Sequence, residues 1–128
     1  MTLKILFIIT TVLGLIFGLG FYFLPTQLLA FHGLTGDVPH LHMAQNFGSA
    51  LLALAVMSWM VKNAPDSIAK RAIILALFVY FTFGSISILR FNLTGIPNMN
   101  AWGDLAFHIP LAIGFGYFFF SNRDKVKE

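Results

Sequence analysis

The chain has 128 residues, 58% of them hydrophobic and only 10% charged, which predicts one membrane-embedded domain over residues 1–128. It contains no cysteine, and this excludes disulfides, thiolate metal ligands and thiol-disulfide redox chemistry. The formal net charge of +3 comes from basic residues that lie at the ends of apolar segments, so nucleic acid is not expected as a partner.

Four apolar segments are long enough to be membrane-spanning helices, since runs of about 18 or more apolar residues can cross a bilayer. The predicted spans are residues 5–24, 43–61, 72–89 and 103–120. The first is too long for the apolar part of a signal peptide, and no small-residue cleavage site follows it, so we expect a retained helix. The fourth contains His108 and Pro110 and is long enough only when its entry at Trp102 is included.

Local signals mark the ends of these segments. The first contains "GLIFG", a G-x-x-x-G pattern that favours close helix packing inside the bundle over a dimer interface. It ends in "FYFLP", where Pro25 discourages continuation, and we expect "TQLLAFHGLTGD" to be a loop with its "LLAF" portion along the membrane interface. Asp37 is predicted to cap the second helix, and Asp66 or Ser67 the third, because such side chains accept from the free N–H groups of a first turn.

The basic residues predict the orientation of the chain, because cytoplasmic loops of membrane proteins carry an excess of Lys and Arg. With four spans and a cytoplasmic N-terminus, seven basic residues fall inside and only Arg90 falls outside. The seven are Lys4, Lys62, Lys70, Arg71, Arg123, Lys125 and Lys127. The predicted fold is therefore all-α: a polytopic membrane protein with four transmembrane helices in an antiparallel bundle and both termini inside (N-in/C-in).

This topology brings most titratable side chains to the outer face. Helical spacing gives polar stripes on the second, third and fourth spans, and polar groups in a bilayer tend to face the bundle interior. We therefore predict a polar cup at the outer end, which forms a ligand-binding site. Its members are His42, Gln45, Asn46, Ser49, Tyr80, Ser87, Arg90, Asp104 and His108.

Ordinary structural roles compete with this prediction. His32 and His40 are expected in the wet outer loop. His108 can bond to Asp104 or to a backbone carbonyl that orients its ring. Arg90 can extend to the outer headgroups or pair with Asp104 across the outer loop.

The chemistry of the cup leaves several hypotheses open. Arg90 with two helix N-termini could hold an anionic lipid headgroup, or the carboxylate or carbonyl of an amphiphile such as a quinone. His42 and His108 could instead ligate haem or, with Asp104, a divalent metal ion, although no sequence motif marks such a site. No catalytic residue is predicted, because no nucleophile stands beside the Asp104–His108 pair.

Parts of the chain resemble known small membrane proteins. Small multidrug-resistance transporters are similar in size but depend on an acidic residue in the first span, and residues 5–24 contain none. The chain is more similar to small bacterial four-helix membrane proteins of the DoxX-like kind, in "FYFLP", "NFGSALLALAVMSW", "APDSIAKR" and "AWGDLAFHIPLAIGFGYF". The resemblance covers the whole chain as topology and small-residue placement. It implies the fold and a location in a bacterial cytoplasmic (inner) membrane. Since some DoxX relatives are implicated in quinone-linked sulfur oxidation, it also implies a membrane redox partner.

The sequence thus favours a non-catalytic membrane protein. Its outer cup is predicted to bind an amphiphile (lipid or quinone), a partner membrane subunit or a second copy of the chain. The alternative is a membrane redox component with haem or metal bound by His42 and His108, and a further alternative is a small transporter.

Overall fold

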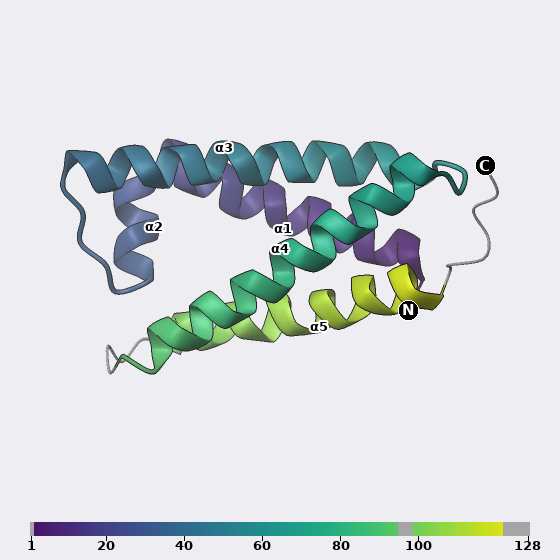
Figure 1. The fold of residues 1–128 in the computed structure, drawn as a ribbon. Helices are drawn as coiled ribbons and strands as arrows, with labels where there is room; N and C mark the ends of the chain where they lie inside the picture. Colours follow the sequence, from purple (N-terminus) through teal and green to yellow (C-terminus); the bar gives the residue numbers. More distant parts are fainter. Residues whose placement is uncertain (1, 95–98, 122–128) are drawn as a thin grey trace. The chain divides into compact units, whose positions relative to one another are not determined.

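The computed structural model describes residues 2–94 and 99–121, and the regular structure in these ranges is all helix. Figure 1 shows the helices, which are α1 (Leu3–Phe23), α2 (Pro25–Phe31), α3 (Val38–Val61), α4 (Ile68–Asn92) and α5 (Met99–Ser121). Four segments are long and apolar enough to cross a membrane: Leu3–Phe23, Val38–Val61, Ile68–Asn92 and Trp102–Ser121. The predicted all-α class and its four apolar spans are confirmed, and they indicate an integral membrane protein.

A short helix, α2, lies where the sequence predicted a loop. Pro25 ends α1 as predicted, but it also occupies the first turn of α2, where its missing N–H leaves no bond unmade. Gly33 ends α2 in the left-handed region with φ 71°. Its N–H bonds to the Ala30 carbonyl at 2.9 Å, and the Leu34 N–H bonds to the Leu29 carbonyl at 2.8 Å, which is the Schellman pattern of a helix C-terminus. The loop prediction was therefore wrong for residues 26–31.

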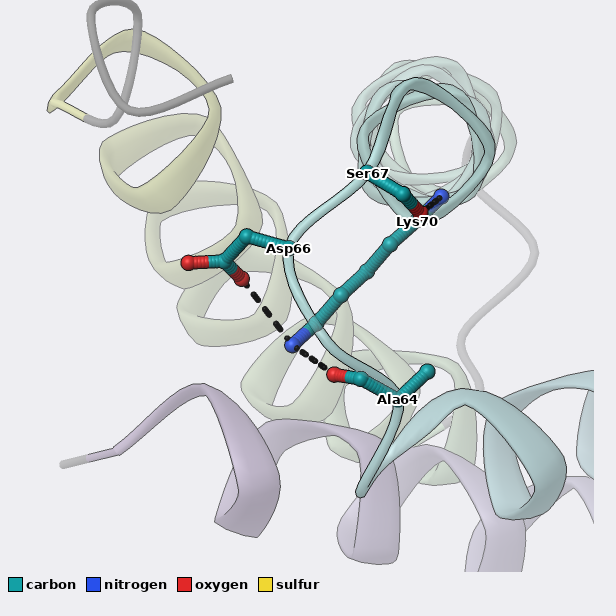
Figure 2. A network of polar contacts seen from close by, with 4 residues as sticks. All are labelled: Ala64, Asp66, Ser67 and Lys70. Carbon is teal, nitrogen blue, oxygen red and sulfur yellow. Dashed lines mark hydrogen bonds and ion pairs between the residues drawn. The ribbon is translucent and has the colours of Figure 1, made fainter. Parts of the chain in front are cut away.

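Side-chain caps start α3 and α4. Asp37 accepts from the His40 N–H at 3.3 Å at the start of α3, which confirms the predicted cap. Ser67 caps α4, accepting from the Lys70 N–H at 3.2 Å, so the second of the two predicted candidates fills this role. Asp66 instead accepts from the Lys70 ammonium at 3.2 Å. This contact is drawn in Figure 2.

The chain divides into two compact units. One comprises Phe7–Lys62, and the other combines the described parts of Met1–Leu6 and Asn63–Glu128. We refer to them as the α1–α3 unit and the α4–α5 unit.

In the α1–α3 unit, α1 and α3 pack antiparallel through small residues. A Cβ added at Gly14 would lie 3.0 Å from the Ala55 Cβ, and one at Gly18 would lie 3.1 Å from the Gly48 carbonyl oxygen. A Cβ at Gly48 would lie 2.8 Å from backbone atoms of Gly18 and Tyr22. The predicted use of the G-x-x-x-G pattern for packing within the chain is thus confirmed, because small residues let two helix backbones approach closely.

In the α4–α5 unit, α4 and α5 also form an antiparallel pair, which Figure 1 shows side by side. The Phe81 and Phe115 rings stack with centroids 6.0 Å apart. A Cβ at Gly116 would lie 2.9 Å from the Phe78 ring, and one at Gly84 would lie 2.8 Å from the His108 ring. Glycines on both helices therefore accept aromatic rings from the partner helix, and this close contact positions His108.

Candidate functional site

The polar stripe on α3 forms hydrogen bonds within the α1–α3 unit. The Asn46 amide lies 3.2 Å from His42 Nε2, and the Ser49 hydroxyl donates to the Gln45 carbonyl at 3.0 Å. The Gln45 amide donates to the Tyr22 carbonyl of α1 at 3.3 Å. Each of these four predicted cup residues therefore bonds a neighbour on α3 or, in the case of Gln45, the end of α1.

The Gln45 bond has a structural cause in the end of α1. The last four carbonyls of a helix have no partner inside the helix. Pro25, with no N–H, cannot extend the α1 ladder, and α1 ends at Phe23. Gln45 therefore supplies one of the missing donors from the neighbouring helix.

The two histidines assigned to the outer loop are held by local contacts. His32 Nδ1 donates to the Leu28 carbonyl at 2.7 Å, and its ring stacks on Phe21 with centroids 5.7 Å apart. His40 Nδ1 lies 2.6 Å from the Asp37 carboxylate. The hydrogen bonds from His40 lower the pKa of Asp37 below its ordinary value. Both histidines thus have ordinary roles at helix ends.

On α5, His108 lies among groups from α4. Its Nδ1 is 2.9 Å from the backbone carbonyl oxygen of Asp104, so of the two predicted partners it is the backbone that orients the ring. The ring centroid lies 5.4 Å from that of Phe81 and 6.2 Å from that of Tyr80. The structure thus brings together Tyr80, Asp104 and His108 from the predicted cup.

Ser87 and Arg90 lie closer to the C-terminal end of α4, and both are exposed. Arg90 stands in the last turn of α4, where a cation is favourable beside the negative end of the helix dipole. Asp104 is partly buried and is not without an interaction partner. The Arg90–Asp104 ion pair stays a prediction.

The α3 stripe belongs to the other unit, so its meeting with these α4–α5 residues also stays a prediction. Within each unit, the described residues contain no group of three or more His, Cys, Asp or Glu side chains able to hold a metal ion. The metal hypothesis draws His42 from one unit and Asp104 and His108 from the other, so it remains a hypothesis.

Two residues of this site were missed by the sequence reasoning. Gly84 is the position on α4 that admits the His108 ring, and Phe81 packs its edge against that ring. A glycine inside an apolar helix signals close approach in general, but it does not say which side chain approaches.

A glycosylation motif lies at the end of α4, and the amide of its asparagine is buried. "NLT" at Asn92 matches a glycosylation sequon. Asn92 is the last residue of α4, and both polar atoms of its amide are buried. We therefore do not assign a glycan to this residue.

Comparisons of the chain with protein-family models, with curated proteins and with solved structures find no match. The resemblance to DoxX-like proteins stays a prediction.

Proposed function

We propose that the protein spans the membrane four times with both termini inside. The charge distribution supports this topology, since it leaves Arg90 as the one basic residue on the outer side. Contacts at the α3 end fit a membrane boundary there, because the Lys62 ammonium lies over the Trp59 ring at 3.1 Å and bonds to the Trp59 carbonyl at 2.9 Å. Trp and Lys of this kind are common where a helix leaves the bilayer.

We further propose that the outer end of α4 and α5 binds an amphiphile, such as a lipid or a quinone, without catalysis. The observation that carries this proposal is the oriented His108 ring, held by the Asp104 carbonyl beside Tyr80 inside an apolar span. Ionisable side chains within membrane spans are expensive and usually mark functional sites. The binding groups are Tyr80, Ser87, Arg90, Asp104 and His108.

Arg90 supports an anionic or carbonyl group as the part of the ligand nearest the surface. It is exposed in the last turn of α4 and lies on the side of the membrane that basic residues avoid. A guanidinium offers five fixed donors, which match carboxylate or phosphate oxygens. An anionic head group bound by Arg90 would explain a basic residue at this position.

A redox role with haem is the second candidate. His108 favours it, because a ring that donates through Nδ1 leaves Nε2 able to bind iron. His42, the proposed second ligand, opposes it, because its Nε2 lies 3.2 Å from the Asn46 amide. An absorption spectrum of natively purified protein decides this point, since bound haem gives a Soret band.

Mass spectrometry of the full-length protein tests amphiphile binding. We expect a lipid or quinone to copurify from the membrane, and Arg90→Ala to reduce its amount severalfold. Lys4→Ala is the matched control, because it removes an exposed basic residue from the predicted inner side. If Arg90→Ala retains as much ligand as Lys4→Ala, the proposal is wrong.

Single cysteines test the topology, since the chain has none of its own. Thr35→Cys is expected to react with a membrane-impermeant thiol reagent in whole cells, and Asn63→Cys only after the membrane is opened. Both positions are exposed and neither caps a helix. The reverse pattern would move Arg90 and His108 to the cytoplasmic face and overturn the proposed topology.

A further inference from the structure

The hydrogen bond of His108 determines which of its ring nitrogens carries the proton. Nδ1 lies 2.9 Å from the Asp104 carbonyl oxygen, which can only accept, so the proton is on Nδ1. In the neutral ring Nε2 then holds a lone pair and can only accept. The neutral ring of His108 therefore presents an acceptor to a ligand.

Nε2 lies at the contact between α5 and α4. A Cβ at Gly84 would be 3.2 Å from Nε2 and 2.8 Å from the adjacent ring carbon, so this edge of the ring faces Gly84. In residues 2–94 and 99–121 no hydrogen-bond partner approaches Nε2. His108 is only partly buried, and its Nε2 is not among the fully buried side-chain atoms that lack a hydrogen-bond partner in those ranges. Nε2 is thus an accessible acceptor inside an apolar span, and no donor among the described residues bonds to its lone pair.

We infer that the amphiphile bound at this site carries a hydroxyl group that donates its hydrogen to Nε2 of His108, beside Gly84 and Tyr80. This inference rests on the proposed function and narrows the ligand class. A carbonyl, ether or carboxylate oxygen would place its lone pair against that of Nε2, whereas a hydroxyl satisfies it. An unsatisfied polar group is costly in hydrocarbon, because no water is there to bond with it.

Paired probes in which a methyl group replaces the hydroxyl hydrogen test this inference on the full-length protein in lipid nanodiscs. One pair is a diacylglycerol and its methyl ether, and the other is a short-chain quinol and its dimethyl ether. We expect the hydroxyl member of one pair to bind about two- to tenfold more tightly than its ether, the range for one net hydrogen bond. The pair that shows the difference identifies the source of the hydroxyl.

Variants then connect the preference to His108. His108→Phe should abolish the difference between hydroxyl and ether, while it retains the affinity for the ether. Phe107→Leu is the matched control, because Phe107 is an exposed neighbour on the same helix, and it should keep the preference. Loss of the preference in both variants would overturn the inference.

Nitrogen NMR of labelled His108 gives a readout without ligand. We expect a protonated Nδ1 and a bare Nε2, and the opposite assignment would overturn the inference. A Soret band in the purified protein would also overturn it, because iron would then occupy the lone pair. Equal binding of hydroxyl and ether in both pairs excludes the hydroxyl but leaves amphiphile binding in place. Absence of binding by all four probes contradicts the inference, whereas the copurification experiment with Arg90→Ala tests the proposed function by itself.

Discussion

Gly48 offers the sharpest test of how the α1–α3 unit is held together. The three atoms nearest to a Cβ added at this position lie 2.8 to 3.1 Å away, and all belong to the backbone of α1. Backbone atoms cannot rotate aside as the end of a flexible side chain can. Gly48→Ala must therefore separate the two helices along this contact.

The expected size of the effect follows from two opposing terms. Alanine in place of glycine stabilises a helix interior by up to about 1 kcal/mol. Overpacking a close contact costs about 1 to 3 kcal/mol, and a backbone obstacle places Gly48→Ala near the upper end. We expect a net decrease of roughly 1 to 2 kcal/mol in the free energy of unfolding.

Two further glycines make this a graded series. At Gly103 a Cβ would meet nothing within 4 Å, so Gly103→Ala should be neutral or slightly stabilising. At Gly20 the nearest atoms are the Leu28 side chain at 3.1 to 3.6 Å, which can shift, so Gly20→Ala should fall between the other two. The assay is unfolding in mixed micelles with increasing SDS, followed by circular dichroism. If Gly48→Ala is as stable as Gly103→Ala, α1 and α3 do not pack as closely at Gly48 as described.

Three other predictions concern polar groups at helix ends. Lys70→Met should destabilise the protein more than Asp66→Ala, because the Lys70 side chain is only 12% exposed whereas that of Asp66 is 54% exposed. Exposed ion pairs contribute little to stability. Equal effects of the two substitutions in the same unfolding assay would contradict this prediction. Gln45→Leu should lower the free energy of unfolding by about 0.5 to 1.5 kcal/mol, because it removes the donor to the Tyr22 carbonyl. It should leave the amount of copurified ligand unchanged. A decrease in that amount would indicate that Gln45 contacts the ligand. Asp37 has a lowered pKa in the folded protein. Its stabilising contribution is therefore complete above the ordinary carboxyl pKa and is lost as the pH falls through the lowered value. An acid titration of stability should show this loss in the native chain and not in Asp37→Asn.

Signals that act over a few residues were sufficient to predict much of the fold. The four spans follow from hydropathy, and the cap at Asp37 follows from a side chain that accepts from the next turn. For α4 the sequence left two candidate caps, and Ser67 is the one used. The short helix α2 was missed because proline was interpreted only as a terminator. Pro25 both ends α1 and begins α2, and the sequence alone does not say whether seven residues after a proline will form a helix.

The partners of buried and half-buried groups could not be predicted in this way. The ring of His108 fits against Gly84, which lies 24 positions earlier on another helix. Gln45 bonds a carbonyl on α1, although its helical spacing with Ser49 made it a candidate ligand. Spacing determines which face of a helix a residue occupies, but the residue's partner depends on which other helix covers that face.

His42 and His108 show how much this difference matters for the binding site. Each has a polar residue four positions away on its own helix, so sequence spacing treats them alike. In α3 the partner is the Asn46 side chain, which faces Nε2, whereas in α5 it is the Asp104 backbone carbonyl, which accepts a hydrogen bond from Nδ1. The first arrangement occupies the nitrogen that a ligand would need, and the second leaves it open. We therefore expect substitutions in the α3 stripe to change stability, and substitution of His108 to change which ligand is bound.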